Sequence, residues 1–254
     1  MSLPDFYLKN KVAIVTGARR GIGKTIALAL AEAGADVAVC DVVVEDGEIE
    51  AVAEEIRRFG RRSLTIQVDV SRKADVENMV KVVKSQFGVI DILVNGAAIL
   101  CRETILEMPE SNWDKQTNIN LKGSFLCAQA VGKVMKEQRK GSIINIASDL
   151  AIYGEPASGA YCAAKAGVVM LTRALSGELG RYGVRANCIA PGLTRTEMSR
   201  KLWENDDLVK QIESITSLGR IGEPEDYIGP VIFLASDAAS YITGNTIVAN
   251  GGRM

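Results

Sequence analysis

Histidine is missing from all 254 residues of the chain. It is the side chain most often used for proton transfer near neutral pH, so any such chemistry here has to rest on other groups. Zinc sites also lose a usual ligand, and no Cys-x-x-Cys pair compensates for it. We therefore expect no metal. The odd number of well-separated cysteines fits reduced thiols in a cytoplasmic protein; they stand at positions 40, 101, 127, 162 and 188.

The sequence also lacks long apolar runs and an excess of one charge. No apolar run approaches the roughly 18 residues that a membrane span requires. The net charge is −1 and basic residues are spread along the chain, whereas nucleic-acid binding needs a basic excess on one face. The densest basic run, RRFGRR (57–62), is expected at the end of a solvated helix. We expect neither a membrane nor a nucleic-acid partner.

The chain does contain a regular alternation of apolar strands and helices. Such alternation predicts an α/β domain with a parallel sheet covered by helices on both faces, here a single domain over residues 1–254. Segment 191–222 is the least regular and is long for a connection, so we expect it to be functional. Predicted strands are 11–17, 36–41, 63–70, 89–95, 141–148, 184–190 and 246–250; predicted helices are 22–34, 47–59, 72–87, 110–138, 160–181 and 224–235.

A glycine-rich turn, TGARRGIG (16–23), separates the first strand from the first helix. Glycines such as Gly17, Gly21 and Gly23 let the backbone approach a pyrophosphate, which the N–H groups of the helix N-terminus can bind. Asp41 ends the second strand, 20 residues past Gly21.

The choice of nucleotide depends on the charges near this turn. A carboxylate at the position of Asp41 binds both ribose hydroxyls and repels a 2′-phosphate, which favours NAD over NADP. Arg19 and Arg20 favour NADP instead, because an arginine can accommodate that phosphate. We give the strand-end carboxylate more weight than the flexible arginines.

Tyr161 and Lys165 lie four residues apart on a predicted helix and therefore on one face. A neighbouring ammonium lowers the pKa of a phenol from about 10, toward the range that acid–base catalysis needs. This spacing is also common by chance, for a surface tyrosine with a supporting lysine. Ser148 favours the reactive interpretation, because it ends the fifth predicted strand, at the sheet edge where such folds bind ligands.

Six motifs in order resemble the short-chain dehydrogenase/reductase family: TGARRGIG, NGAA (95–98), Asn120 within NINLKG, Ser148, YCAAK (161–165) and PGLTRT (191–196). The C-terminal stretch 223–252 is similar to that of 3-oxoacyl-carrier-protein reductases and of gluconate or polyol dehydrogenases. The resemblance covers nearly all of residues 8–252. It implies a Rossmann-type domain with about seven parallel strands, usually assembled as a homotetramer.

The resemblance also implies a catalytic set of four residues, none of them histidine. Tyr161 would be the general acid/base, and Lys165 would lower its pKa and hold the nicotinamide ribose. Ser148 would hydrogen-bond the substrate oxygen, and Asn120 would hold a water that extends the proton relay.

Cofactor contacts are implied by position as well. Ile22 and Gly23 would line the pyrophosphate, Asp69 and Val70 would flank the adenine, and Asn95, Gly96 and Ala97 would pass beneath the adenosine ribose. Pro191, Gly192 and Thr196 would lie by the nicotinamide. Family members usually read Asn-Asn-Ala-Gly where this chain has NGAA, which puts the side-chain bonds that brace the central sheet in doubt.

The resemblance implies that segment 191–222 closes over the substrate. The alternative is that its apolar residues only pack an amphipathic turn. Its apolar candidates are Leu193, Met198, Leu202 and Trp203; the polar candidates are Asp149, Tyr153, Glu155, Cys101, Arg102 and Arg195. Acids near Ser148 suit the hydroxyls of a polyol, whereas an arginine suits a carboxylate.

We therefore expect an oxidoreductase that transfers hydride between NAD(H) and a small secondary alcohol or ketone of the polyol, sugar or hydroxy-acid type. The alternative is a 3-oxoacyl-thioester reductase; such enzymes usually prefer NADPH, so Asp41 argues against it. A non-catalytic nucleotide sensor ranks last, because Tyr161 and Lys165 are both present.

Overall fold

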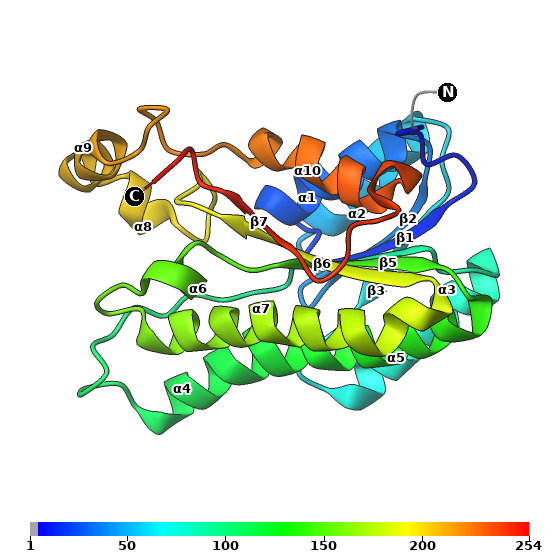
Figure 1. Ribbon diagram of the computed structural model, residues 1–254, viewed down its shortest axis with the longest axis horizontal. Coiled ribbons are helices and arrows are strands. Elements are labelled where there is room, and N and C mark those ends of the chain that lie inside the picture. The colour runs from blue at the N-terminus through cyan, green and yellow to red at the C-terminus, as the bar shows by residue number, and fades with distance from the viewer. Residues whose placement is uncertain (1–4, 254) are drawn as a thin grey trace.

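Seven parallel strands form one sheet in the computed structural model, which describes residues 5–253 (Figure 1). The ends of the predicted domain, residues 1–4 and 254, lie outside the described residues. The strand order is β3-β2-β1-β4-β5-β6-β7, so the chain starts mid-sheet, runs outward to one edge and returns to the other side of β1. The strands are β1 (Val12–Thr16), β2 (Asp36–Asp41), β3 (Ser63–Gln67), β4 (Ile92–Asn95), β5 (Gly141–Ile146), β6 (Val184–Pro191) and β7 (Thr246–Ala249).

Helices cover both faces of the sheet, which confirms the predicted single α/β domain. On one face lie α1 (Gly21–Glu32), α2 (Glu48–Arg58) and α10 (Ile228–Ala235), and on the other α3 (Lys73–Phe87), α5 (Gly123–Gln138) and α7 (Gly159–Leu179) (Figure 1). Each face buries its own apolar cluster, which is why the central strands are apolar throughout. None of the helices in the described chain is both long and apolar enough to cross a bilayer.

Several predicted elements differ in their bounds. The long helix predicted over 110–138 is divided into α4 (Glu110–Thr117), a π-helical turn (Asn118–Lys122) and α5. Short 3-10 turns follow α7 (Gly180–Tyr182), precede α10 (Pro224–Tyr227) and follow it (Asp237–Ala239). Strand β3 ends at Gln67 and β5 at Ile146, where its pairing with Ile189 ends. Ser148 therefore lies two residues beyond the strand that it was expected to end, just before the short helix α6 (Leu150–Tyr153).

Segment 191–222 is more ordered than predicted. It contains α8 (Arg200–Trp203) and α9 (Asp206–Ser214), which pack through a small apolar cluster that includes Val209, Ile212 and Ile221. The C-terminal tail runs beside it, and the Leu218 N–H donates to the Gly251 carbonyl at 3.0 Å. In Figure 1 the C-terminal end of the chain accordingly lies next to α8 and α9.

Candidate active site

A cavity of about 740 Å³ opens at the carboxyl ends of the strands. Its walls include Gly17 after β1, Asp41 at the end of β2, Gly96 after β4 and Pro191 at the end of β6. The strand order reverses between β1 and β4, and open α/β sheets bind ligands at such a switch point. The sheet topology therefore explains where the cavity lies.

The glycine-rich turn fits a pyrophosphate by its close backbone contacts. A Cβ on Gly23 would lie 2.0 Å from the Gly17 carbonyl oxygen, and one on Gly17, at φ +68°, would lie 2.8 Å from the Ala97 backbone. Only glycine therefore lets α1 begin so close to β1. The first turn of α1 carries no acidic residue. Its unpaired N–H groups and positive dipole can thus face an anion.

At the ribose end of the cavity the carboxylate of Asp41 lies beside Arg19. Asp41 accepts a hydrogen bond from the Val43 N–H at 3.1 Å and lies 3.8 Å from Nε of Arg19. Arg19 also pairs with Glu48 at 3.1 Å and with Asp46. Three carboxylates thus surround the guanidinium that was expected to favour a 2′-phosphate. Arg20 is exposed and lines the cavity.

Ser148, Tyr161 and Lys165 line the same cavity. The lysine side chain is 2 % exposed and its Nζ donates to the Ile146 carbonyl at 2.7 Å. This bond attaches α7 to the end of β5 and places Nζ 5.6 Å from the centre of the Tyr161 ring. A hydroxyl, a phenol and an amine therefore converge on one wall.

The pKa values of Tyr161 and Lys165 differ from the expectation that the lysine lowers the pKa of the tyrosine. Burial raises the pKa of the Tyr161 phenol above its ordinary value, while its hydrogen bond with Ser148 acts in the opposite direction. Burial lowers the pKa of Lys165 to about 8. The expected lowering of the tyrosine pKa by Lys165 is not found, because the amine donates to Ile146 and burial dominates at the phenol.

Asn120 lies in the π-helical turn and is fully buried, outside the cavity lining. Its Oδ1 accepts from the Ile99 N–H at 2.8 Å, and its Nδ2 donates to the Ile99 carbonyl at 2.9 Å. The side chain that was expected to hold a water is therefore occupied in bracing Ile99, which lines the cavity.

Asn95 is buried beneath the cavity rather than in its wall. Its Nδ2 donates to Asn145 Oδ1 at 2.8 Å, and Asn145 Nδ2 donates to Thr172 Oγ1 at 2.8 Å. This chain of amides joins β4, β5 and α7. The sheet is thus braced even though NGAA departs from the family pattern.

The cavity wall contains most of the residues that the sequence singled out. The predicted cofactor contacts that line it are Gly17, Arg19, Arg20, Gly21, Ile22, Gly23, Asp41, Asp69, Val70, Gly96, Ala97, Tyr161, Lys165, Pro191, Gly192 and Thr196. Of the substrate candidates, Leu193, Met198, Leu202, Asp149 and Glu155 line the cavity, whereas Trp203, Tyr153, Cys101, Arg102 and Arg195 do not. Trp203 instead packs within its segment and donates from Nε1 to the Thr196 carbonyl at 2.8 Å.

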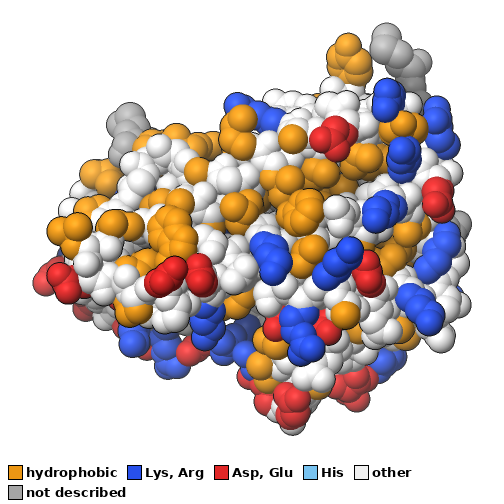
Figure 2. All heavy atoms as spheres, turned by 90° about the horizontal axis from the view of Figure 1, so that it is seen from below, with side chains coloured by type: hydrophobic (Ala, Val, Ile, Leu, Met, Phe, Trp, Pro, Cys, Tyr) orange, Lys and Arg blue, Asp and Glu red, His pale blue; other side chains and the backbone are white. Residues whose placement is uncertain are grey.

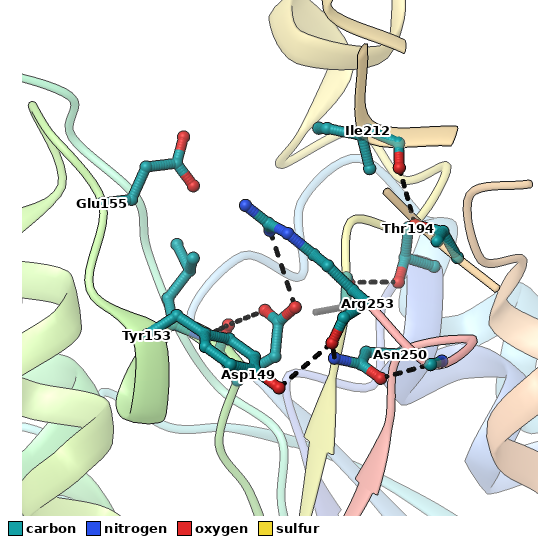
Figure 3. Close-up of polar contacts among 12 residues, drawn as sticks. Asp149, Tyr153, Glu155, Thr194, Ile212, Asn250 and Arg253 are labelled. Carbon is teal, nitrogen blue, oxygen red and sulfur yellow. Dashed lines mark hydrogen bonds and ion pairs between the residues drawn. The ribbon is translucent and has the colours of Figure 1, made fainter. Parts of the chain in front are cut away.

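Arg253 is a cavity residue that sequence reasoning missed. Its guanidinium approaches the buried carboxylate of Asp149, with 3.6 Å between Nη1 and Oδ2 (Figure 3). The two residues are far apart in the chain and share no motif. No sequence pattern signals their approach.

The chain is similar to known proteins over nearly its whole length. The family model described as Enoyl-(Acyl carrier protein) reductase matches residues 17–253. The chain is 46% identical over 243 residues to 3-oxoacyl-[acyl-carrier-protein] reductase FabG of Staphylococcus epidermidis, covering 96% of this chain and 98% of that protein. It is 42% identical over 246 residues to (2S)-[(R)-hydroxy(phenyl)methyl]succinyl-CoA dehydrogenase subunit BbsD of Thauera aromatica, covering 97% of both.

A solved structure shares the whole fold. The gluconate 5-dehydrogenase of Burkholderia cenocepacia, in complex with NADP and tartrate, superposes with a TM-score of 0.94 at 34% identity, covering 98% of this chain and 97% of that one. The shared sheet, the glycine-rich turn and the full-length matches together show that this chain belongs to the short-chain dehydrogenase/reductase family, whose members are oxidoreductases acting on alcohol and keto groups.

Proposed function

We propose that this protein interconverts 3-oxoacyl and 3-hydroxyacyl thioesters with NAD(H). The observation that carries the reaction type is the convergence of Ser148, Tyr161 and Lys165 on one wall of a cavity that the glycine-rich turn also lines. The thioester class rests on two full-length relatives, at 46% and 42% identity, whose names specify acyl-carrier-protein and CoA thioesters.

The chain's own residues supply binding and proton transfer, while the bound nicotinamide would supply or accept the hydride. Ser148 would turn its hydroxyl hydrogen from Asp149 to the substrate oxygen, while its Oγ still accepts from the Leu150 N–H at 3.2 Å. The raised pKa of Tyr161 keeps the phenol protonated at neutral pH. In the reduction direction it would therefore protonate that oxygen as an acid.

Lys165 would reload the tyrosine and hold the cofactor ribose. Its pKa of about 8 lies close to neutral pH, so its amine can both give and take a proton there. The buried Asn120 would keep the loop around Ile99 in place at the cavity wall.

NAD is proposed rather than NADP because of the charges at the ribose end. Asp41 lines the cavity at the end of β2 and would accept from a ribose hydroxyl, and Arg19 pairs with Asp41, Asp46 and Glu48. A 2′-phosphate would therefore meet the Asp41 carboxylate at the end of β2, and of the two arginines it is Arg20, exposed in the cavity wall, that is left to pair with it. The NADP bound to the gluconate dehydrogenase shows that a relative with this fold accepts NADP, so the proposed preference rests on this chain's own residues at the ribose end.

A second candidate substrate class is a hydroxy acid or polyol. It is favoured by the polar groups beside Ser148, where Asp149, Glu155 and Arg253 line the cavity. The gluconate dehydrogenase matched above acts on a substrate of this kind.

One experiment tests the proposal. Nicotinamide absorbance is followed with NADH and 3-oxoacyl-CoA thioesters, and with NAD and hydroxy acids or polyols. We expect thioester turnover that falls by about 10²–10⁴-fold in Tyr161→Phe. The control, Tyr7→Phe, changes an exposed tyrosine outside the cavity and should retain full rate. Turnover of hydroxy acids or polyols alone would replace the thioester class, and undiminished turnover in Tyr161→Phe would refute the catalytic assignment.

A further inference from the structure

The C-terminal tail brings a cation to the catalytic serine. Asp149, which follows Ser148, is 1 % exposed, and its Oδ1 accepts from Ser148 Oγ at 3.4 Å. Its Oδ2 makes no hydrogen bond to any residue in 5–253, and Nη1 of Arg253 lies 3.6 Å away. Figure 3 shows the arginine side chain reaching across toward Asp149 and Glu155. Arg253, Asp149 and Ser148 thus form a continuous polar row.

The backbone of Arg253 is held firmly. The Tyr153 hydroxyl donates to its carbonyl at 3.1 Å and Asn250 Nδ2 donates to the same oxygen at 3.4 Å (Figure 3). The tail also forms an isolated β-bridge with Thr216 from segment 191–222. All of these contacts are made by the backbone of Arg253 and none by its side chain. Replacing the side chain should therefore leave the tail attached.

The charges around Arg253 leave it available to an anion. The carboxylate of Glu155 already pairs with Arg102 at 2.9 Å. Asp149 approaches one nitrogen of the guanidinium, Nη1. Because a guanidinium carries five N–H donors in a planar fork, donors are left over for a ligand. The side chain of Arg253 is still 17% exposed and lines the cavity. Leu193 and Ile212 lie in the same wall and lower the local polarity, which strengthens an ion pair.

We propose that Arg253 binds a carboxylate of the substrate, with Asp149 holding the guanidinium in position, so that the substrate is an oxo or hydroxy compound with a free carboxylate near the reacting carbon. Carboxylates match the arginine fork in a bidentate manner. The inference rests on the proposed function, because it assumes that the reacting oxygen lies at Ser148. Within the thioester class, it specifies an acyl chain with a second, free carboxylate.

The test compares matched charged and neutral substrates. The pairs are the CoA thioester of 3-oxohexanedioic acid with its terminal methyl ester, and gluconate with gluconamide. Each is measured with wild type, Arg253→Gln, Arg253→Lys and Arg200→Gln. Arg200 is the control, because it is an exposed arginine of α8 that pairs with Glu204 and lies outside the cavity.

We expect Arg253→Gln to lower kcat/KM for the charged substrate by about 10- to 100-fold, mainly through KM, and to lower it much less for the neutral partner, where only the loss of the ion pair with Asp149 is felt. Arg253→Lys should recover part of the loss, because it keeps the charge without the fork. Equal effects on charged and neutral substrates, or none, would overturn the carboxylate assignment.

The two proposals fail separately. Rapid turnover of neutral thioesters with no dependence on Arg253 would leave the thioester function standing and refute the carboxylate site. Turnover of gluconate but not of any thioester, with loss in Arg253→Gln, would refute the thioester class and support the site.

Discussion

Lys165 shows at the scale of one residue how function conflicts with stability. A buried amine loses hydration, and here one hydrogen bond to Ile146 replaces it. Burial consequently lowers its pKa from 10.5 to about 8. Such a cost is expected where a residue serves chemistry rather than folding.

Stability should therefore depend on pH through Lys165. Between about pH 8 and 10.5 the unfolded chain keeps the lysine proton while the folded chain has lost it, so raising the pH favours folding in that window. We expect Lys165→Met to unfold at higher denaturant concentration than wild type at pH 7. This advantage should shrink by roughly 2 kcal/mol by pH 9.5.

Urea titrations of both proteins at the two pH values measure the difference, because the cysteines and tyrosines that also titrate in this range are common to both proteins. A constant advantage would show that Lys165 is not the group responsible.

Asp41 should determine nucleotide preference. In Asp41→Ala we expect NADH to bind about tenfold more weakly, because its ribose loses a charged acceptor, and NADPH to bind more tightly. Fluorescence titration of both nucleotides measures this. Asp237→Ala, which removes an exposed carboxylate outside the cavity, serves as the control. If both affinities stay the same in Asp41→Ala, the ribose assignment is wrong.

At the scale of elements, the first strand, its glycine-rich turn and the first helix act as one unit. The N-terminal turn of α1 is packed directly on the backbone after β1, where a Cβ on Gly23 would lie 2.0 Å from the Gly17 carbonyl oxygen. The helix around Asn120 is also irregular. Its π-helical turn places the buried side-chain amide of Asn120 in hydrogen-bond contact with the backbone of Ile99. In both cases a break in regular geometry serves the cavity wall.

Gly23→Ala should consequently damage both binding and stability. The added methyl group meets backbone rather than a flexible side chain, so α1 has to move, at a cost of about 1–3 kcal/mol or more. Nucleotide affinity should fall with it. Gly177→Ala is the matched control, because nothing lies within 4 Å of its Cβ within α7, and it should raise stability by about 0.5–1 kcal/mol. Thermal melts and NADH titrations measure both effects, and unchanged NADH affinity in Gly23→Ala would contradict the assignment.

At the scale of the whole molecule, helices α4, α5 and α7 form one side of the protein. Figure 2 looks at this side and shows hydrophobic side chains gathered between basic ones. The exposed large hydrophobic residues of these helices are Trp113, Phe125 and Met170. Exposed apolar area of this kind is typical of an interaction surface.

The homotetramer implied by the family stays a prediction. Light scattering should give about four times the 27.2 kDa chain mass. Phe125→Glu would place a charge on this face and should lower that mass, whereas Phe59→Glu, at the end of α2 on the opposite side of the sheet, should not. A monomeric wild type would end this prediction.

The sequence alone determined the fold class and most of the nucleotide site. Apolar strands alternating with helices leave few arrangements other than a covered parallel sheet, and Gly17, Gly21 and Asp41 are positioned by short local rules about turns and strand ends. The predicted cofactor contacts lie in the cavity wall apart from Asn95, because nearly all of them follow directly from a strand end.

Tertiary structure alone decided the remaining features, because they depend on contacts between distant segments. Burial, not the neighbouring lysine, sets the direction of the Tyr161 pKa shift, and burial is a property of the packed molecule. The side chain of Asn120 reaches Ile99, and the interrupted helix that allows this is invisible in apolar periodicity. Arg253 approaches Asp149 only because β7 ends beside β6 and the tail then crosses segment 191–222. Local rules cannot foresee such an encounter, since it requires the whole sheet to be in place.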